Sequence, residues 1–195
     1  MIIEHIYQNI EGFFNFEELY DDIIDELPEN SKFVEVGVWK GKSISYAVVE
    51  SLTKNKKINF YAVDTFKGSI GEPFLEYHSS VVHKTLYYEY IKNIMPIMNN
   101  ITTIPADSIT ASQLFENKSV DFVFIDASHK YENVKADILT WLPKIKPGGY
   151  IGGHDYVSDP DHADYGVTKA VNEIIGADKV KIYEPDWPSW LYKVE

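Results

Sequence analysis

The 195-residue sequence predicts an α/β fold, in which helices cover both faces of a mostly parallel β-sheet. Short β-branched or apolar runs alternate along the chain with segments in which apolar residues recur at helical spacing. Proline and glycine stand where one element should end and the next begin. Alternation of this kind favours right-handed β-α-β units, which gather ligands at the carboxyl ends of the strands.

The first helix is predicted at residues 16–27, where apolar residues keep helical spacing until Pro28 ends the helix. The first strand follows at residues 32–37, and the alternation then continues. Further strands are expected at residues 58–64, 101–105, 120–126 and 149–153. The helices between them are expected at residues 41–52, 81–94, 109–115 and 131–142.

The end of the chain departs from this alternation. A last helix is predicted at residues 167–175, followed by two strands at residues 179–183 and 191–194. Only a few residues around Pro185 and Pro188 separate the two strands, which is too short for a parallel crossover. The last strand is therefore expected to run antiparallel.

Length and composition favour one globular domain with an N-terminal helical segment (residues 1–30) and a core (residues 31–195). A net charge of −12 disfavours nucleic acids and anionic membranes as partners, because their phosphates would be repelled. The absence of cysteine excludes disulfides and thiolate chemistry and fits a reducing compartment. Neither a membrane-spanning apolar run nor a secretory signal pattern is present, so we expect a cytoplasmic protein.

Residues 34–43 combine a strand, a glycine turn and the start of a helix. A dinucleotide site needs glycine where Trp39 stands, and the loop of a nucleoside triphosphatase needs one more residue between its glycines. The pattern acidic-x-Gly-x-x-x-Gly fits Glu35, Gly37 and Gly41 and is typical of an S-adenosylmethionine site. Glu35 is expected to attract the ammonium or sulfonium group. Alternatively, the glycines only form a tight turn and Glu35 pairs with a lysine.

The next two strands also end in polar residues. Asp64 lies 23 positions after Gly41, near the spacing at which an acidic residue binds the ribose hydroxyls. It could equally be a turn or cap aspartate. Asp107 and Ser108 follow the third strand and are either ligands of the adenine edge or ordinary helix N-caps.

With these motifs placed, the sequence resembles the class I S-adenosylmethionine-dependent methyltransferases, and among them the family-24 group that includes macrolide sugar O-methyltransferases. The resemblance covers nearly the whole chain from Phe14 onward. Its motifs are residues 34–37, 63–68, 106–108, 124–129 and 147–156. It implies a Rossmann-like three-layer sandwich with a seven-stranded sheet, a bound S-adenosylmethionine and often a divalent metal that holds the acceptor hydroxyl.

The fourth and fifth strands end in two polar pairs, Asp126 with His129 and His154 with Asp155, which should face one cleft. Carboxylates from adjacent strand ends suit Mg²⁺, and His129 could act as general base. The resemblance implies that Asp126 and Asp155 bind the metal. His154 departs from the family pattern, because an acidic residue is usual there, and a nitrogen ligand shifts preference towards Mn²⁺, Fe²⁺ or Zn²⁺. Alternatively, the histidines only orient loops, and Asp126 contacts the cofactor without a metal.

The sequence thus predicts a methyltransferase that acts on a hydroxyl of a small, sugar-containing acceptor. A nucleoside triphosphatase and a non-catalytic cofactor-binding module are the alternatives. His78 and His83 are expected on a surface helix rather than a lid, and Trp187 and Trp190 are expected in the core. The oligomeric state is open, a homodimer included.

Overall fold

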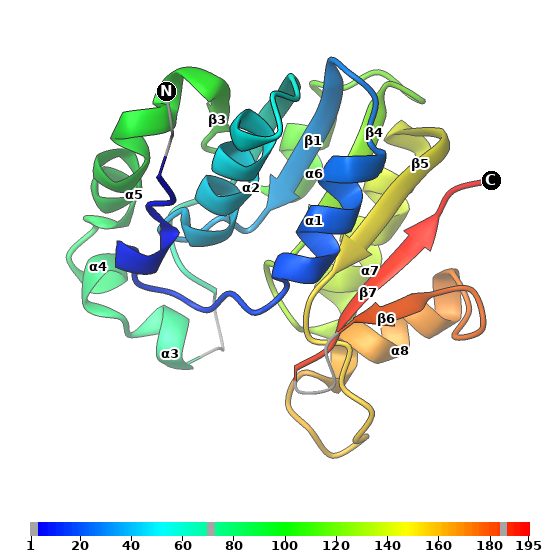
Figure 1. Cartoon of the computed structure of the whole chain (residues 1–195). Coiled ribbons are helices and arrows are strands. Elements are labelled where there is room, and N and C mark those ends of the chain that lie inside the picture. The colour runs from blue at the N-terminus through cyan, green and yellow to red at the C-terminus, as the bar shows by residue number, and fades with distance from the viewer. Residues whose placement is uncertain (1–3, 70–72, 184–186) are drawn as a thin grey trace.

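The computed structural model describes residues 4–69, 73–183 and 187–195 (Figure 1). Its seven strands form one sheet in the order β3-β2-β1-β4-β5-β7-β6. The strands are β1 (Ser31–Val36), β2 (Ile58–Val63), β3 (Ile101–Ile104), β4 (Val120–Ile125), β5 (Ile145–Gly153), β6 (Lys181–Tyr183) and β7 (Ser189–Lys193). Strands β1 to β5 are parallel, and β7 pairs antiparallel with both β5 and β6. The predicted sheet and its antiparallel last strand are confirmed.

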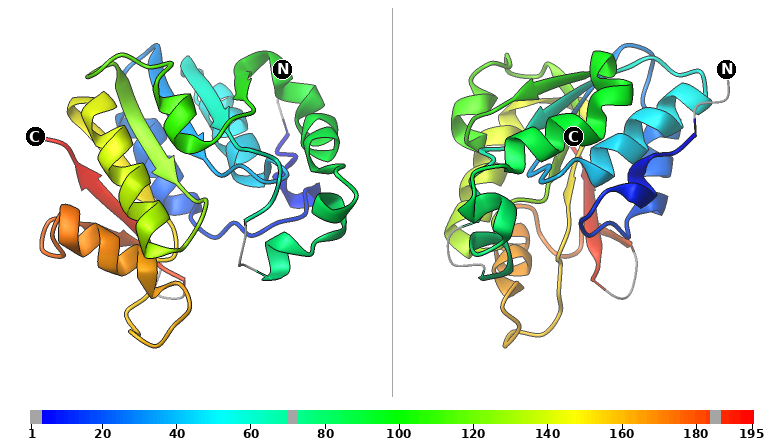
Figure 2. Two further views of the ribbon diagram at one scale, coloured as in Figure 1. Left: turned by 180° about the vertical axis from the view of Figure 1, so that it is seen from behind. Right: turned by 90° about the vertical axis from the view of Figure 1, so that its left-hand side faces the viewer.

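Helices cover both faces of the sheet. One face packs against α1 (Glu17–Glu26), α2 (Lys42–Thr53) and α5 (Leu86–Ile94), and the other against α6 (Ser108–Ser112), α7 (Tyr131–Trp141) and α8 (Tyr165–Ile174) (Figures 1 and 2). Two short helices, α3 (Pro73–Glu76) and α4 (Ser79–Val82), precede α5. The 3₁₀ helices are η1 (Tyr7–Asn9), η2 (Met95–Asn100) and η3 (Leu142–Lys144). Among the described residues, no helix has the length and apolar character needed to span a membrane.

The two cores follow from the period-two alternation of β1. Phe33 points into the core beneath α1 and α2, whereas Val34 and Val36 point into the core beneath α7 and α8. Glu35 has the same parity as Phe33 and therefore belongs to the α1 and α2 face.

Two expected elements differ from the prediction. The helix expected at residues 81–94 is broken, because Lys84 adopts a left-handed φ of 58°. The Glu89 carboxylate holds the break by accepting hydrogen bonds from the hydroxyls of Thr85 (2.6 Å) and Ser80 (2.7 Å). Strand β5 begins at Ile145, before the strand expected at residues 149–153, and its pairing with β4 is irregular between Val120 and Phe122.

Candidate active site

A cavity of about 520 Å³ opens at the carboxyl ends of β1 to β4, between the sheet and α7. The polar side chains that line it come from the ends of β2, β3 and β4 and from α7. They include Asp64, Asp107, Ser108, Asp126, Ser128, Asn133 and Asp137. The cavity therefore lies where the parallel topology is expected to gather ligands.

Gly37 allows the ends of β1 and β4 to approach each other. Its φ is +92°, and a Cβ atom at this position would lie 1.9 Å from the carbonyl oxygen of Asp126. Only glycine tolerates both conditions. Gly41 also has a positive φ, but it does not line the cavity, and a Cβ there would meet Ile94 at 2.9 Å and the Tyr90 ring. The two glycines thus serve different purposes, cavity formation and helix packing.

Glu35 does not line the cavity, in contrast to the contact expected from its motif. Its carboxyl is 0% exposed and accepts hydrogen bonds from the hydroxyls of Tyr20 (2.7 Å) and Ser43 (2.5 Å). Burial raises the pKa of Glu35 to about 8, although both hydrogen bonds lower it. The carboxyl is therefore mostly neutral at pH 7 and supports the fold beneath the glycine turn. A contact with the cofactor ammonium stays a prediction that this geometry does not favour.

The Gly-Lys-Ser sequence does not form a phosphate cradle. The ammonium of Lys42 donates to the carbonyl oxygen of Gly12 at 3.0 Å, and the Ser43 hydroxyl donates to Glu35. Neither side chain lines the cavity. This arrangement argues against the nucleoside triphosphatase alternative.

Asp64 lines the cavity at the end of β2. Its two carboxylate oxygens accept backbone N–H groups, from Trp39 at 2.8 Å and from Phe66 at 2.7 Å. Burial raises the pKa of Asp64, while the amide hydrogen bonds lower it in part. These bonds fix the carboxyl plane and leave lone pairs for a ligand.

Asp107 and Ser108 line the cavity and also organise α6. Asp107 is the N-cap, accepting the Thr110 backbone N–H at 2.9 Å and the Thr110 hydroxyl at 2.7 Å. The Ser108 hydroxyl oxygen accepts the indole N–H of Trp141 at 2.9 Å. Asp107 is therefore the helix N-cap that the sequence allowed and also lines the cavity, while a contact with the adenine stays a prediction.

A compact polar cluster lies at the ends of β4 and β5. Asp126, His154 and Asp155 each offer a ligand atom, and these atoms all lie within 4.8 Å of one another. Asp155 has a left-handed φ of 60°, a backbone conformation that aspartate tolerates better than most residues with a side chain. The sequence prediction that the two strand ends share one site is thus matched by their placement.

His129 joins this cluster through both ring nitrogens. Its Nε2 lies 3.0 Å from Asp155 Oδ2, and its Nδ1 lies 2.8 Å from Asp164 Oδ1. His154 is held similarly, with Nδ1 3.0 Å from Asp155 Oδ2 and Nε2 2.8 Å from Asn15 Oδ1. Asp155 therefore lies between two imidazole rings.

These contacts set the ionisation of the cluster. Burial raises the pKa of Asp155, but the hydrogen bonds from His129 and His154 outweigh it, so that the pKa lies well below its usual range. Burial lowers the pKa of His154, but Asp155 and the charge of Asp126 outweigh it and raise the pKa overall. Both shifts therefore favour an ion pair between Asp155 and His154 at the end of the sheet.

The cluster adjoins the cavity. Asp126, Ala127 and Ser128 line the large cavity, and they also line a small pocket of about 10 Å³ whose other walls include His129 and His154. A ligand that fills the cavity as far as Asp126 is therefore next to the two imidazoles.

Comparison with known proteins places this arrangement in a family. A sequence model described as a methyltransferase domain, methyltransferase family 24, matches residues 34–156. The chain belongs to this family. The matched residues run from β1 to the residue after Asp155, so they include both the cavity and the polar cluster. The predicted membership of the class I S-adenosylmethionine-dependent methyltransferases is confirmed.

Solved structures show that the methyltransferase shares its fold with several such proteins. The O-methyltransferase NovP has a TM-score of 0.63 at 14% identity, over 91% of this chain and 78% of that one. A putative methyltransferase from Streptococcus mutans in complex with SAH has a TM-score of 0.59 at 14% identity, over 93% of this chain and 97% of that one. At these identities the likeness concerns the fold.

Two relatives are matched in sequence. An uncharacterized protein of Acanthamoeba polyphaga mimivirus is 27% identical over 193 residues, covering 93% of this chain and 70% of that protein. An uncharacterized protein of Sinorhizobium fredii is 31% identical over 98 residues, covering 49% of this chain. The methyltransferase chain matches 10% of the length of the Sinorhizobium protein.

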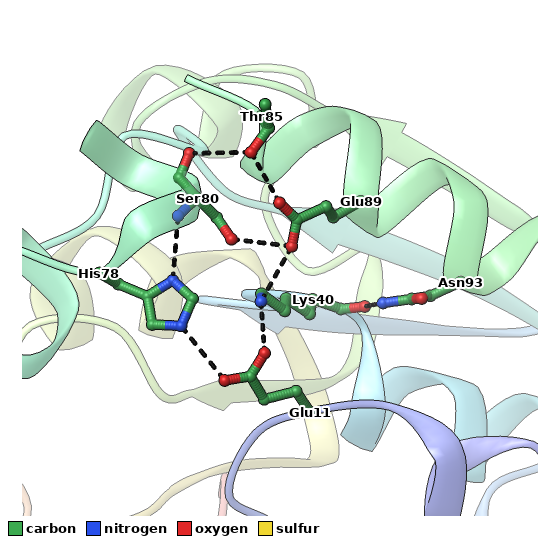
Figure 3. A network of polar contacts seen from close by, with 7 residues as sticks. All are labelled: Glu11, Lys40, His78, Ser80, Thr85, Glu89 and Asn93. Atoms are coloured by element: carbon green, nitrogen blue, oxygen red, sulfur yellow. Dashed lines mark hydrogen bonds and ion pairs between the residues drawn. The ribbon is translucent and has the colours of Figure 1, made fainter. Parts of the chain in front are cut away.

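A network of charged residues fixes the N-terminal segment of the methyltransferase to the glycine turn and to the helices before β3 (Figure 3). Lys40 is 5% exposed, and its ammonium lies 2.6 Å from Glu11 and 2.9 Å from Glu89. His78 Nε2 lies 3.2 Å from Glu11 Oε1, and His78 Nδ1 accepts the Ser80 backbone N–H at 3.2 Å. His78 is therefore a connecting residue and not the surface residue that was expected.

The predictions for His83, Trp187 and Trp190 have different outcomes. His83 is exposed, as predicted, and Trp190 is fully buried in the core. The prediction for Trp187 is wrong, because its side chain is 51% exposed and its backbone has a φ of 58°. The ring lies edge-on to His162 at a centroid distance of 5.2 Å.

Two residues of the site of this methyltransferase, Asn15 and Asp137, were missed as functional candidates. Asn15 contacts His154 from a segment far away in the sequence, and no local signal marks it. Asp137 is a buried carboxyl on the apolar face of α7 that lines the cavity. The sequence pattern could have identified Asp137, because a charged residue at an apolar position of an amphipathic helix is unusual and indicates a specific role.

Proposed function

We propose that this protein transfers the methyl group of S-adenosylmethionine to a hydroxyl group of a small-molecule acceptor. The observation that carries the proposal is the shared wall between the cavity and the polar cluster, formed by residues 126–128. A cofactor in the cavity with its sulfonium end towards Asp126 would bring the methyl group beside His129. A base next to the methyl donor is what an oxygen acceptor requires.

The cavity residues suit the parts of the cofactor in the order of the strands. Gly37 lines the cavity where the ends of β1 and β4 approach each other. Asp64 is proposed to accept the ribose hydroxyls, and Asp107 and Ser108 to contact the adenine. Asp126, at the border with the polar cluster, is proposed to lie nearest the amino-acid part of the cofactor.

His129 is proposed to be the general base, and Asp164 orients it by fixing Nδ1. The acceptor hydroxyl would replace Asp155 at Nε2 and give its proton to that nitrogen. The acceptor oxygen then forms a bond to the methyl carbon while the carbon–sulfur bond breaks. The positive sulfonium becomes the neutral thioether of S-adenosylhomocysteine, so charge and atoms balance.

Asp126, His154 and Asp155 also fit a divalent cation, because two carboxylates and an imidazole offer ligand atoms within 4.8 Å of one another. To act as a ligand, His154 would exchange the contact between Nδ1 and Asp155 for the metal. A nitrogen donor favours Mn²⁺ over Mg²⁺. When bound, such a cation lowers the pKa of a coordinated hydroxyl. A sugar acceptor suits this site, since its hydroxyls can donate to several carboxylates at once.

Titration calorimetry with S-adenosylhomocysteine tests the cofactor assignment. Wild-type protein should bind, and Asp64→Ala should bind roughly 10- to 100-fold more weakly, since a hydrogen bond to a charged group is worth about 1.5–3 kcal/mol. Glu116→Ala removes an exposed carboxylate outside the cavity and serves as the matched control. Failure of the wild-type protein to bind would refute the proposal.

Two further measurements test the chemistry. Isotopically labelled S-adenosylmethionine, incubated with a panel of hydroxylated small molecules that includes sugars, should label an acceptor oxygen. Mn²⁺ should raise the melting temperature of the wild-type protein more than Mg²⁺ does, and Asp155→Ala should remove that increase. A melting temperature that no divalent cation changes would contradict the metal assignment alone.

A further inference from the structure

The inward face of α7 carries one residue that does not match its neighbours. The buried residues of this helix are Val134, Asp137, Ile138 and Trp141. Three of them are apolar and pack in the core beneath α7 and α8. Asp137 is a carboxyl that is only 6% exposed. A buried carboxyl is costly unless another group compensates it.

Within the described part of the chain, no lysine or histidine forms an ion pair with Asp137. The neighbouring charge that acts on it is Asp107, which is also negative. The Ser108 hydroxyl is the group that favours its ionised form, because it lowers the pKa of Asp137 in part. Because the oxygen of Ser108 accepts the Trp141 N–H, its hydroxyl hydrogen is available for Asp137. A carboxylate can accept about four hydrogen bonds, so most of this capacity is unused.

The Asp137 carboxylate, which can accept further hydrogen bonds, lies at the cavity. Asp137 lines it together with Asn133 and Ala136 from the same helix and with Asp107 and Ser108 from the loop after β3. Asp107 is the charged neighbour that acts on Asp137 here, and neither of the two lysines that line the cavity, Lys67 and Lys130, forms an ion pair with Asp137. This corner of the cavity therefore suits a ligand group that donates hydrogen bonds and rejects one that only accepts them. Burial raises the pKa of Asp137 to about 6, so the carboxyl is mainly in its accepting, ionised form at pH 7.5.

We propose that Asp137 selects adenine as the base of the cofactor by accepting a hydrogen bond from its 6-amino group. This inference rests on the proposed function, which places the adenine beside Asp107 and Ser108. A base with an oxo group at position 6 presents an acceptor there and would meet the carboxylate oxygens unfavourably. Sites that hydrogen-bond an N–H group discriminate strongly against analogues that lack it, because buried polar groups are then left unpaired.

The test compares S-adenosylhomocysteine with S-inosylhomocysteine, which differs by an oxo group in place of the amino group. Calorimetry at pH 7.5 on the wild-type protein should show at least roughly 100-fold weaker binding of the inosine compound. In Asp137→Asn the ratio should fall below about tenfold, because the amide can turn its N–H₂ towards the oxo group. Glu132→Gln, an exposed carboxylate on the same helix, should keep the wild-type ratio.

The outcomes are distinct. Equal binding of the two ligands by the wild-type protein would overturn the inference, and this comparison needs no variant that has to fold. An Asp137→Asn variant with a normal melting temperature and the wild-type ratio would overturn it as well. If the wild-type protein binds neither compound, the proposed function fails, and the inference fails with it.

Discussion

Replacing the carboxyl of Glu35 by the amide of glutamine should remove a pH-dependent contribution to the stability of the fold. The unfolded chain titrates Glu35 near its ordinary pKa of 4.5, whereas burial raises the pKa in the folded protein to about 8. Between these values the folded protein binds the proton and the unfolded chain has released it. The free energy of unfolding therefore falls as the pH rises through this window.

The magnitude follows from the pKa difference. One bound proton changes the free energy of unfolding by about 1.4 kcal/mol per pH unit, which gives about 2.7 kcal/mol between pH 5.5 and pH 7.5. Glu35→Gln has no such proton, and its amide can still bond to Tyr20 and Ser43. The variant should thus gain about 2–3 kcal/mol over the wild-type protein between the two pH values.

Urea denaturation at pH 5.5 and pH 7.5 measures this directly, since the midpoint and slope give the free energy at each pH. Glu116→Gln, an exposed carboxyl, should follow the wild-type protein at both pH values. Tyr20→Phe removes a donor that stabilises the carboxylate, so it should raise the pKa of Glu35 further and extend the pH dependence to higher pH, with little change between pH 5.5 and pH 7.5. A constant difference between Glu35→Gln and wild type at the two pH values would refute the reasoning, because Glu35 would then be ionised in the core.

Three further predictions concern the site. Gly37→Ala should unfold the protein or abolish S-adenosylhomocysteine binding, because its Cβ would lie 1.9 Å from the Asp126 carbonyl oxygen. Gly148 has a φ of +81° and no atom within 4 Å of the position of a Cβ, so Gly148→Ala should lower the free energy of unfolding by only about 1 kcal/mol in a denaturation experiment. His129→Ala should lower methyl transfer by roughly 10²–10⁴-fold and leave calorimetric S-adenosylhomocysteine binding nearly unchanged; a parallel loss of binding would contradict its role as a base. Lys40→Met removes the cation between two carboxylates, so amide hydrogen exchange in residues 4–16 should speed up, and unchanged exchange would show that the network of Figure 3 does not hold this segment.

The strands could be predicted from the sequence because their signals are local, but the helix break before α5 could not. The break at Lys84 depends on Glu89, which accepts hydrogen bonds from Ser80 and Thr85. Side chains on two elements must already be placed for that arrangement to exist. A helical pattern that spans residues 81–94 carries no sign of it.

The sequence predicts which residues lie at the cavity where topology alone decides their place, but not where side-chain parity decides, and their roles as ligands stay predictions. Asp64 and Asp126 line the cavity because they follow strand ends. Glu35 lies inside β1 with the parity of Phe33, so alternation directs it under α1 and α2. The motif predicts that Glu35 contacts the cofactor, whereas the alternation of side chains along β1 predicts that Glu35 points into the core. Asp164 and Asn15 reach the histidines through tertiary contacts, which no sequence pattern encodes.

The backbone of the site is fixed by the sheet itself, although the functional residues follow the strands. The Asp126 amide donates to the Val36 carbonyl oxygen at 2.8 Å, and the Asp64 amide donates to Ile104 at 3.3 Å. The His154 amide continues the same pattern, donating to Ile125 at 3.3 Å. The backbone of each of these residues thus continues the hydrogen bonding between neighbouring strands, while its side chain lies beyond the carboxyl end of its strand. Side-chain replacements at these positions should consequently alter ligand binding and chemistry with little change of fold, whereas backbone changes at Gly37 should disturb both.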